Sequence, residues 1–117
     1  MDYRNQSAPI KEEEKVFDFL PELISKMGEI RKRITFHGRV QGVGFRYTAR
    51  LAAGSLGLTG WAKNEYDGTV TMEVQGSEGM INKLLVRLNT DHFIRIEWMD
   101  SEEIPIREDE KGFQIKY

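Results

Sequence analysis

Apolar and polar positions alternate through much of the sequence after residue 30. Successive side chains of a strand point to opposite faces, so this alternation is typical of strands with one face toward a core. The pattern recurs in five segments, at residues 34–40, 58–64, 70–74, 94–98 and 113–117. We therefore predict five strands.

Two further stretches have apolar residues at helical spacing, which predicts two helices. Gly57 is suited to end the first helix, and Ser77 is suited to cap the start of the second. The apolar face of the first comprises Phe45, Ala49, Ala52 and Leu56. The apolar face of the second comprises Ile81, Leu84, Leu85 and Leu88. Gly54 lies within the first helix and should weaken it by about 1 kcal/mol relative to alanine.

The elements follow in the order strand, helix, strand, strand, helix, strand, with a strand added at the end. This order indicates an α+β ferredoxin-like sandwich, the split βαβ plan, in which two helices cover one face of an antiparallel sheet. Tyr66-Asp67-Gly68 has the turn chemistry of a hairpin, and we interpret residues 102–111 as an acidic loop. If the first strand lies beside the third, the loop after the first strand lies near the end of the second.

Residues 1–30 have a different pattern. Residues 11–15 are a solvated charge run, and Pro21 interrupts the helical spacing that follows it. The residues at this spacing are Val16, Leu20, Leu23 and Met27. We interpret residues 1–30 as an N-terminal extension, partly disordered or in short helices, that covers a surface of the domain or of a second subunit. Residues 31–117 then form one domain.

Composition narrows the classes of function. A chain of 117 residues with 39% hydrophobic content is sufficient for one compact core, and a net charge of −2 disfavours a general nucleic-acid or anionic-membrane binder. The chain has no cysteine, and His37 and His92 lack a metal-ligand spacing. No apolar run reaches the roughly 18 residues of a membrane span. We expect a cytoplasmic protein without metal, cofactor, nucleic-acid or membrane partner.

Residues 38–46 read Gly-Arg-Val-Gln-Gly-Val-Gly-Phe-Arg. Gly42 and Gly44 allow the backbone to turn several N–H groups toward one point, and the helical spacing from Phe45 onward places these groups at a helix N-terminus. Arg46 adds a charged planar fork that matches two phosphate oxygens. The segment therefore predicts a pocket for a phosphate-sized group.

This segment matches neither common nucleotide-binding loop. No Lys-Ser or Lys-Thr pair follows the glycines, and glycines at 38, 42 and 44 do not fit the dinucleotide spacing. Taken alone, an ordinary turn followed by a solvated Arg46 explains the segment equally well.

A second candidate residue ends the predicted second strand, in Gly60-Trp61-Ala62-Lys63-Asn64. Asn64 carries both a donor and an acceptor, which is what is needed to hold a water molecule and aim it. Taken alone, an asparagine that opens a turn explains this position better.

Together, the two segments resemble the acylphosphatases. The first motif matches at Gly38, Val40, Gln41, Gly42, Val43, Phe45 and Arg46. The second matches at Gly60, Trp61, Asn64, Gly68, Val70 and Gly76. The C-terminal Gly-Phe-Gln-Ile-Lys-Tyr also looks like the last strand of the family, so the resemblance covers residues 31–117. The extension, Gly54-Ser55 and Thr90-Asp91-His92 depart from the usual pattern, and none of them is a motif residue.

The resemblance implies hydrolysis of acyl phosphates to a carboxylate and inorganic phosphate, with no metal and no cofactor. By motif position, Arg46 corresponds to the phosphate-binding catalytic arginine of the family, and Asn64 to its water-positioning asparagine. The phosphate cradle is then made by the backbone N–H groups of Gln41, Gly42, Val43, Gly44, Phe45 and Arg46. The partner is a small-molecule acyl phosphate. We expect a monomer, with a dimer through the extension as the alternative.

Two other functions compete with this one. The same pocket would serve a non-catalytic module that binds phosphate or another small anion. The open sheet face would serve a single-strand RNA binder, for which the first strand offers Arg31, Lys32 and Arg33 but no matching aromatic pair is evident.

Overall fold

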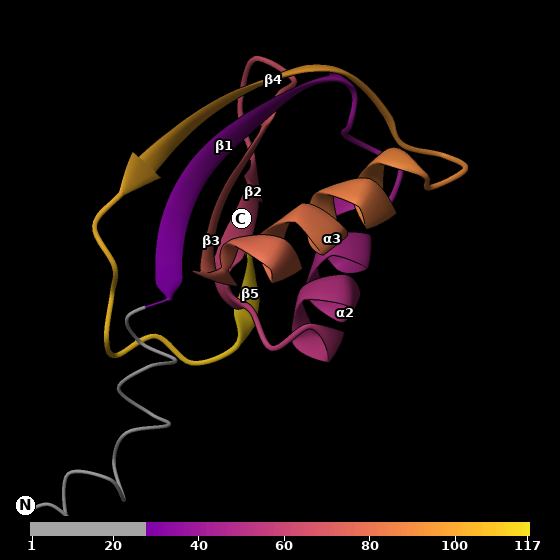
Figure 1. The fold of residues 1–117 in the computed structure, drawn as a ribbon. Coiled ribbons are helices and arrows are strands. Elements are labelled where there is room, and N and C mark those ends of the chain that lie inside the picture. The colour runs from indigo at the N-terminus through magenta and orange to yellow at the C-terminus, as the bar shows by residue number, and fades with distance from the viewer. Residues whose placement is uncertain (1–27) are drawn as a thin grey trace, which may run out of the picture.

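The computed structural model describes residues 28–117 (Figure 1). In chain order the elements are β1 (Glu29–Arg39), α2 (Phe45–Ser55), β2 (Thr59–Asn64), β3 (Val70–Ser77), α3 (Glu78–Asn89), β4 (Arg95–Ile104) and β5 (Phe113–Lys116). The expectations for the extension up to Met27 lie outside the described residues. No helix in residues 28–117 is long and apolar enough to cross a membrane.

The five strands form one sheet in the order β4-β1-β3-β2-β5. Strand β1 is antiparallel to both β3 and β4, and β2 is antiparallel to β3. Helices α2 and α3 lie on the same side of this sheet, and the opposite face carries no helix in residues 28–117 (Figure 1). The ferredoxin-like α+β fold is therefore confirmed.

The prediction of a wholly antiparallel sheet is wrong at one edge, where β5 runs parallel to β2. Strand β4 ends beside Arg31, at the end of the sheet where β2 begins. The chain therefore crosses along that end of the sheet and enters β5 in the direction of β2.

Strand β4 also extends to Ile104, so residues 102–104 are strand and the acidic loop is shorter than predicted. The later part of this edge strand is exposed and lacks the apolar alternation that predicts its start at residues 94–98.

The hydrophobic core lies between the sheet and the two helices. Its fully buried members include Ile34, Phe36, Val70, Met72, Val74, Phe45, Ala49, Ala53, Ile81, Leu84 and Leu88. In α2 both Ala49 and Ala53 are fully buried, one turn apart, whereas Ala52, which the sequence pattern placed on the apolar face, packs at the edge of the core. Ser77 caps α3 as predicted, because its Oγ accepts a hydrogen bond from the Met80 N–H at 3.3 Å.

The strand order places the candidate residues at one end of the sheet. Phe36 of β1 and Asn64 of β2 are both paired with Val70 of the central strand β3. The loop that follows β1 and the end of β2 are therefore neighbours. The predicted adjacency of these two segments is confirmed.

Candidate active site

Residues 40–44 connect β1 to α2 and form a glycine turn at the start of the helix. Gly42 has φ 73° and Gly44 has φ 79°, in the left-handed region that glycine adopts without steric cost. Gly44 is the N-cap of α2, and within residues 28–117 no side chain caps this helix end. The first N–H groups of α2 are therefore available to an anion, which the helix dipole also favours.

Two buried side chains fix the ends of this loop. Val40 is 1% exposed and Phe45 is 2% exposed, and the Phe45 ring centroid lies 4.8 Å from that of Phe36. Because both ends of the loop are held in the core, the glycine backbone between them has a defined position.

The side chain of Gln41 ties the loop to the hairpin between β2 and β3. Its Nε2 donates to the carbonyl oxygens of Glu65, at 2.7 Å, and Thr69, at 2.8 Å. Asp67 holds Thr69 in turn, because its Oδ1 accepts from the Thr69 hydroxyl at 2.6 Å and from its N–H at 3.0 Å. The hydroxyl hydrogen bond is the main cause that lowers the pKa of Asp67 below its ordinary value. The loop is thus coupled to the hairpin that carries Asn64.

Arg46 lies in the first turn of α2 and is held on one side only. Its Nη1 donates to the carbonyl oxygen of Lys116 at 3.1 Å, and its Cζ lies 4.9 Å from the ring centroid of Tyr117. Within residues 28–117, no carboxylate lies within 4.0 Å of its guanidinium. Most of its hydrogen-bonding capacity therefore remains available for a ligand.

Arg46 and Asn64 line one cavity of about 320 Å³, together with Gly42 and Gly44. The rest of its lining comprises Val40, Phe45, Tyr47, Arg50, Ile115 and Tyr117. The two glycines and Arg46 come from the start of α2, whereas Asn64 is the last residue of β2. Two segments that are separate in the sequence thus supply one site.

Two of the predicted cradle residues use their side chains elsewhere. The Gln41 amide is occupied by the hairpin contacts, and Val43 packs against the core. The prediction from the sequence concerns only the backbone N–H groups of these two residues, which are expected to bind phosphate. That role remains a prediction.

Three cavity residues with polar side chains were not predicted from the sequence to belong to the site: Tyr47, Arg50 and Tyr117. Arg50 follows Arg46 by one helical turn, and this spacing is the signal that could have identified it. Tyr117 reaches the cavity because β5 is parallel to β2, which the apolar pattern did not predict.

Neither histidine lines the cavity. His37 lies on the open face of the sheet, where its ring stacks on Trp98 with the centroids 3.6 Å apart. Its Nε2 is 3.1 Å from Oδ2 of Asp100. His92 follows α3 and packs edge-on against Phe93. Among residues 28–117, no carboxylate side chain lines the cavity either.

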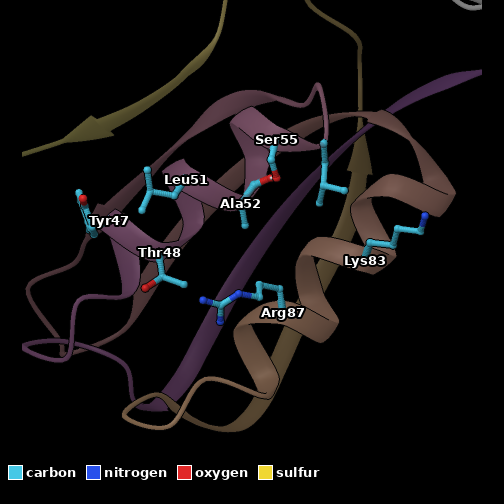
Figure 2. A pocket seen from close by; sticks show the side chains of 8 residues that line it. Tyr47, Thr48, Leu51, Ala52, Ser55, Lys83 and Arg87 are labelled. Atoms are coloured by element: carbon cyan, nitrogen blue, oxygen red, sulfur yellow. The ribbon is translucent and has the colours of Figure 1, made fainter.

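A larger hollow, of about 540 Å³, lies on the helical layer. Figure 2 shows it between Tyr47, Thr48 and Leu51 of α2 on one side and Lys83 and Arg87 of α3 on the other. Among residues 28–117 its lining comes from α2, from the C-cap residue Leu56 and from α3, and it includes neither a glycine turn nor a helix N-terminus. The glycine turn, Arg46 and Asn64, which the sequence singles out, therefore lie together at the smaller cavity and not at this hollow.

Comparison with known proteins agrees with this geometry. The family model described as acylphosphatase matches residues 32–115. An acylphosphatase of Clostridium acetobutylicum is 44% identical over 81 residues, which are 68% of this chain and 89% of that protein. An acylphosphatase of Geobacillus kaustophilus is 44% identical over 74% of this chain and 94% of its own length. The crystal structure of the acylphosphatase from Bacillus subtilis superposes with a TM-score of 0.69 at 32% identity, covering 75% of this chain and 99% of that one.

Proposed function

The chain belongs to the acylphosphatase family, hydrolases of acyl phosphates, and we propose that Arg46 and Asn64 are the catalytic residues of this reaction. The observation that supports the proposal is the single cavity that brings Arg46, Asn64 and the glycine turn together. A module that only binds phosphate is less favoured, because the relatives that match most of the chain are named acylphosphatases.

In the proposed step, the phosphoryl group binds to the backbone N–H groups of residues 41–46 and to the guanidinium of Arg46. Asn64 holds a water molecule in line with the bond to be broken. The water oxygen bonds to phosphorus while the bond between phosphorus and the acyl oxygen breaks, and the carboxylate leaves with the electron pair. The proton of the water passes to the phosphate product. The products are one carboxylate and one inorganic phosphate.

The chemistry of the leaving group explains why such a site suffices. A carboxylate is a weak base, so its departure does not require a general acid. The remaining tasks are to position the reactants and to stabilise the charge of the transition state, which are the main requirements of phosphoryl transfer. The glycine turn, the helix N-terminus and Arg46 meet the second requirement, and Asn64 meets the first.

The experiment that tests the proposal is the hydrolysis of acetyl phosphate by the full chain, with and without a metal chelator. We expect release of inorganic phosphate that the chelator does not change. An Arg46→Gln protein, purified in the same way, controls for a contaminating phosphatase. Binding of phosphate without turnover would contradict the proposal and favour the anion-binding module.

We also propose that the enzyme acts as a monomer, because Arg46, Asn64 and the glycine turn, which the proposed step requires, all come from one chain. Light scattering of the full chain tests this, and a dimer would direct attention to residues 1–30 as the interface.

A cytoplasmic location remains a prediction from the sequence, to be tested by cell fractionation.

A further inference from the structure

The cavity contains a second guanidinium that the proposed hydrolysis does not use. Arg50 follows Arg46 by four residues on α2, so both side chains lie on the same face of the helix, and both line the cavity. Like charges one turn apart repel each other. Within the part of the chain that the structure describes, no carboxylate lies within 4.0 Å of either guanidinium. An anion in the cavity would relieve this repulsion.

The two guanidiniums are held at different places in the cavity. Arg46 adjoins the glycine turn, and its guanidinium lies over the ring of Tyr117, the residue that follows β5. Arg50 lies about 6 Å further along the helix axis, and its guanidinium is 5.5 Å from the ring centroid of Tyr47. Tyr47 is 54% exposed, so this second cation lies at the mouth of the cavity. Arg46 is therefore placed to bind a phosphoryl group on the glycine turn. Arg50 is placed beside the part of the ligand that extends from this phosphoryl group toward the mouth of the cavity.

What extends outward from a bound phosphoryl group is the acyl part of the substrate. We propose that Arg50 determines specificity by binding a carboxylate on this acyl part, so that acyl phosphates of dicarboxylic acids are preferred over those with an uncharged acyl group. The planar fork of arginine matches a carboxylate in bidentate geometry. The Tyr47 ring supports the guanidinium through its face. This inference rests on the proposed function and adds a substrate class to it.

The test compares succinyl phosphate with butyryl phosphate, two substrates that differ by a carboxylate in place of a methyl group. For each protein the quantity of interest is the ratio of kcat/KM for succinyl phosphate to kcat/KM for butyryl phosphate. We expect Arg50→Gln to lower this ratio about fivefold, mainly through the KM for succinyl phosphate. Arg50→Lys should give an intermediate ratio, because it keeps the charge and loses the fork. Added salt should lower the ratio of the wild-type enzyme.

Lys83→Gln is the matched control. Lys83 is an exposed cation on α3. It lines the larger hollow between α2 and α3 (Figure 2) and does not line the cavity that contains Arg46 and Arg50. Its removal changes the net charge equally and should leave the ratio at the wild-type value. An equal fall of the ratio in Lys83→Gln would overturn the inference, because long-range attraction would then account for the preference.

The remaining outcomes separate this inference from the proposed function. If Arg50→Gln lowers kcat/KM equally for both substrates, Arg50 contacts the phosphoryl group and the inference is wrong. If the wild-type enzyme hydrolyses both substrates and Arg50→Gln leaves the ratio unchanged, the inference alone fails. If the wild-type enzyme hydrolyses neither substrate, the proposed function fails with it.

Discussion

Arg31 and Arg46 lie in two regions of the domain that differ in burial and in the hydrogen-bond partners they offer to an arginine. Arg31 is fully buried on the face of the sheet that carries no helix. Its Nε donates to Glu73 at 3.0 Å, and its Nη1 donates to Gln75 at 3.1 Å and to Glu110 at 2.7 Å. Its Nη2 donates to the second oxygen of Glu110 at 3.0 Å. The guanidinium is thus surrounded by acceptors from the protein.

Within residues 28–117, Arg46 has one hydrogen bond, to a backbone carbonyl, and it borders an open cavity. The difference shows that the partners of an arginine, and not its charge, decide whether it can serve a ligand. Arg31 joins β1 and β3 to the segment after β4, whereas Arg46 keeps donors for an anion. The same contrast weakens the RNA-binding alternative, because Arg31 is buried and Arg33 pairs with Glu73 at 3.1 Å.

The comparison predicts its largest effect for Arg46→Lys. Because one ammonium group cannot replace the bidentate fork, kcat/KM should fall on the order of 10²–10³-fold although the charge is kept. Acetyl phosphate hydrolysis measures the loss, and the melting temperature should stay near that of the wild type. Retention of most of the wild-type rate would remove Arg46 from the centre of the mechanism.

Arg31→Leu should have the reverse profile. Removing one member of a buried ionic network leaves the carboxylates of Glu73 and Glu110 without their partner, which should lower the free energy of unfolding by about 3 kcal/mol. The melting temperature should fall by roughly 10–20 °C, while kcat of the folded enzyme is kept.

Arg33→Leu is the control, because Arg33 pairs with the same Glu73 but its side chain is 50% exposed. Its cost should stay below about 1 kcal/mol, and equal melting of the two variants would show that burial of Arg31 is unimportant.

Asn64→Ala tests the other proposed catalytic residue. Loss of a single positioning group should lower kcat on the order of 10²-fold. Inhibition by inorganic phosphate should persist, because the glycine turn and Arg46 remain. If the inhibition constant for phosphate rises in step with the loss of kcat, Asn64 contacts the phosphate or supports the fold.

The two regions should also respond differently to acid. Burial acts to raise the pKa of Glu110, but the hydrogen bonds and the charge of Arg31, together with the charge of Arg107, outweigh it and lower the pKa below the ordinary value. A lowered pKa in the folded state stabilises the protein above the ordinary carboxyl pKa, near 4.3, and this contribution is lost as the pH falls through the lower value. Thermal melts should therefore show a loss of stability below about pH 4. Arg31→Leu should make this loss shallower, and an unchanged acid limb would contradict the assignment.

The smallest effect is expected for catalysis across neutral pH. In the part of the chain that the structure describes, no histidine and no carboxylate side chain lines the cavity, so kcat should be nearly flat between about pH 5 and pH 8. An ionisation in this range that disappears on mutation of His37 or His92 would show that one of them acts as a catalytic base.

Local patterns in the sequence were enough to predict most of the fold. The alternation around Ile34 and Phe36 and the helical spacing from Phe45 depend on near neighbours, and the structure confirms both. Edge strands carry little of this signal. Strand β4 is mostly exposed, so its last residues were assigned to a loop, and the parallel direction of β5 depends on a crossing that no local pattern records.

The buried network of Arg31 could not be predicted for a similar reason. Its partners Glu73 and Glu110 lie 42 and 79 residues further along the chain. Acidic residues in charged stretches are usually solvated, and no local pattern distinguishes Glu110 from its acidic neighbours, yet its side chain is only 9% exposed. The glycine turn and Asn64 were found because a motif recorded their spacing, whereas Arg50 and Tyr117 lie outside the motif.

The hydrogen bonds from Gln41 to Glu65 and Thr69 have a thermodynamic consequence for binding. They fix the glycine turn before any substrate arrives, so the conformational entropy of this loop is lost when the chain folds and not when phosphate binds. A preorganised site of this kind requires little rearrangement in the transition state. It also makes the turn and the hairpin that carries Asn64 a single mechanical unit, in which a displacement of one displaces the other.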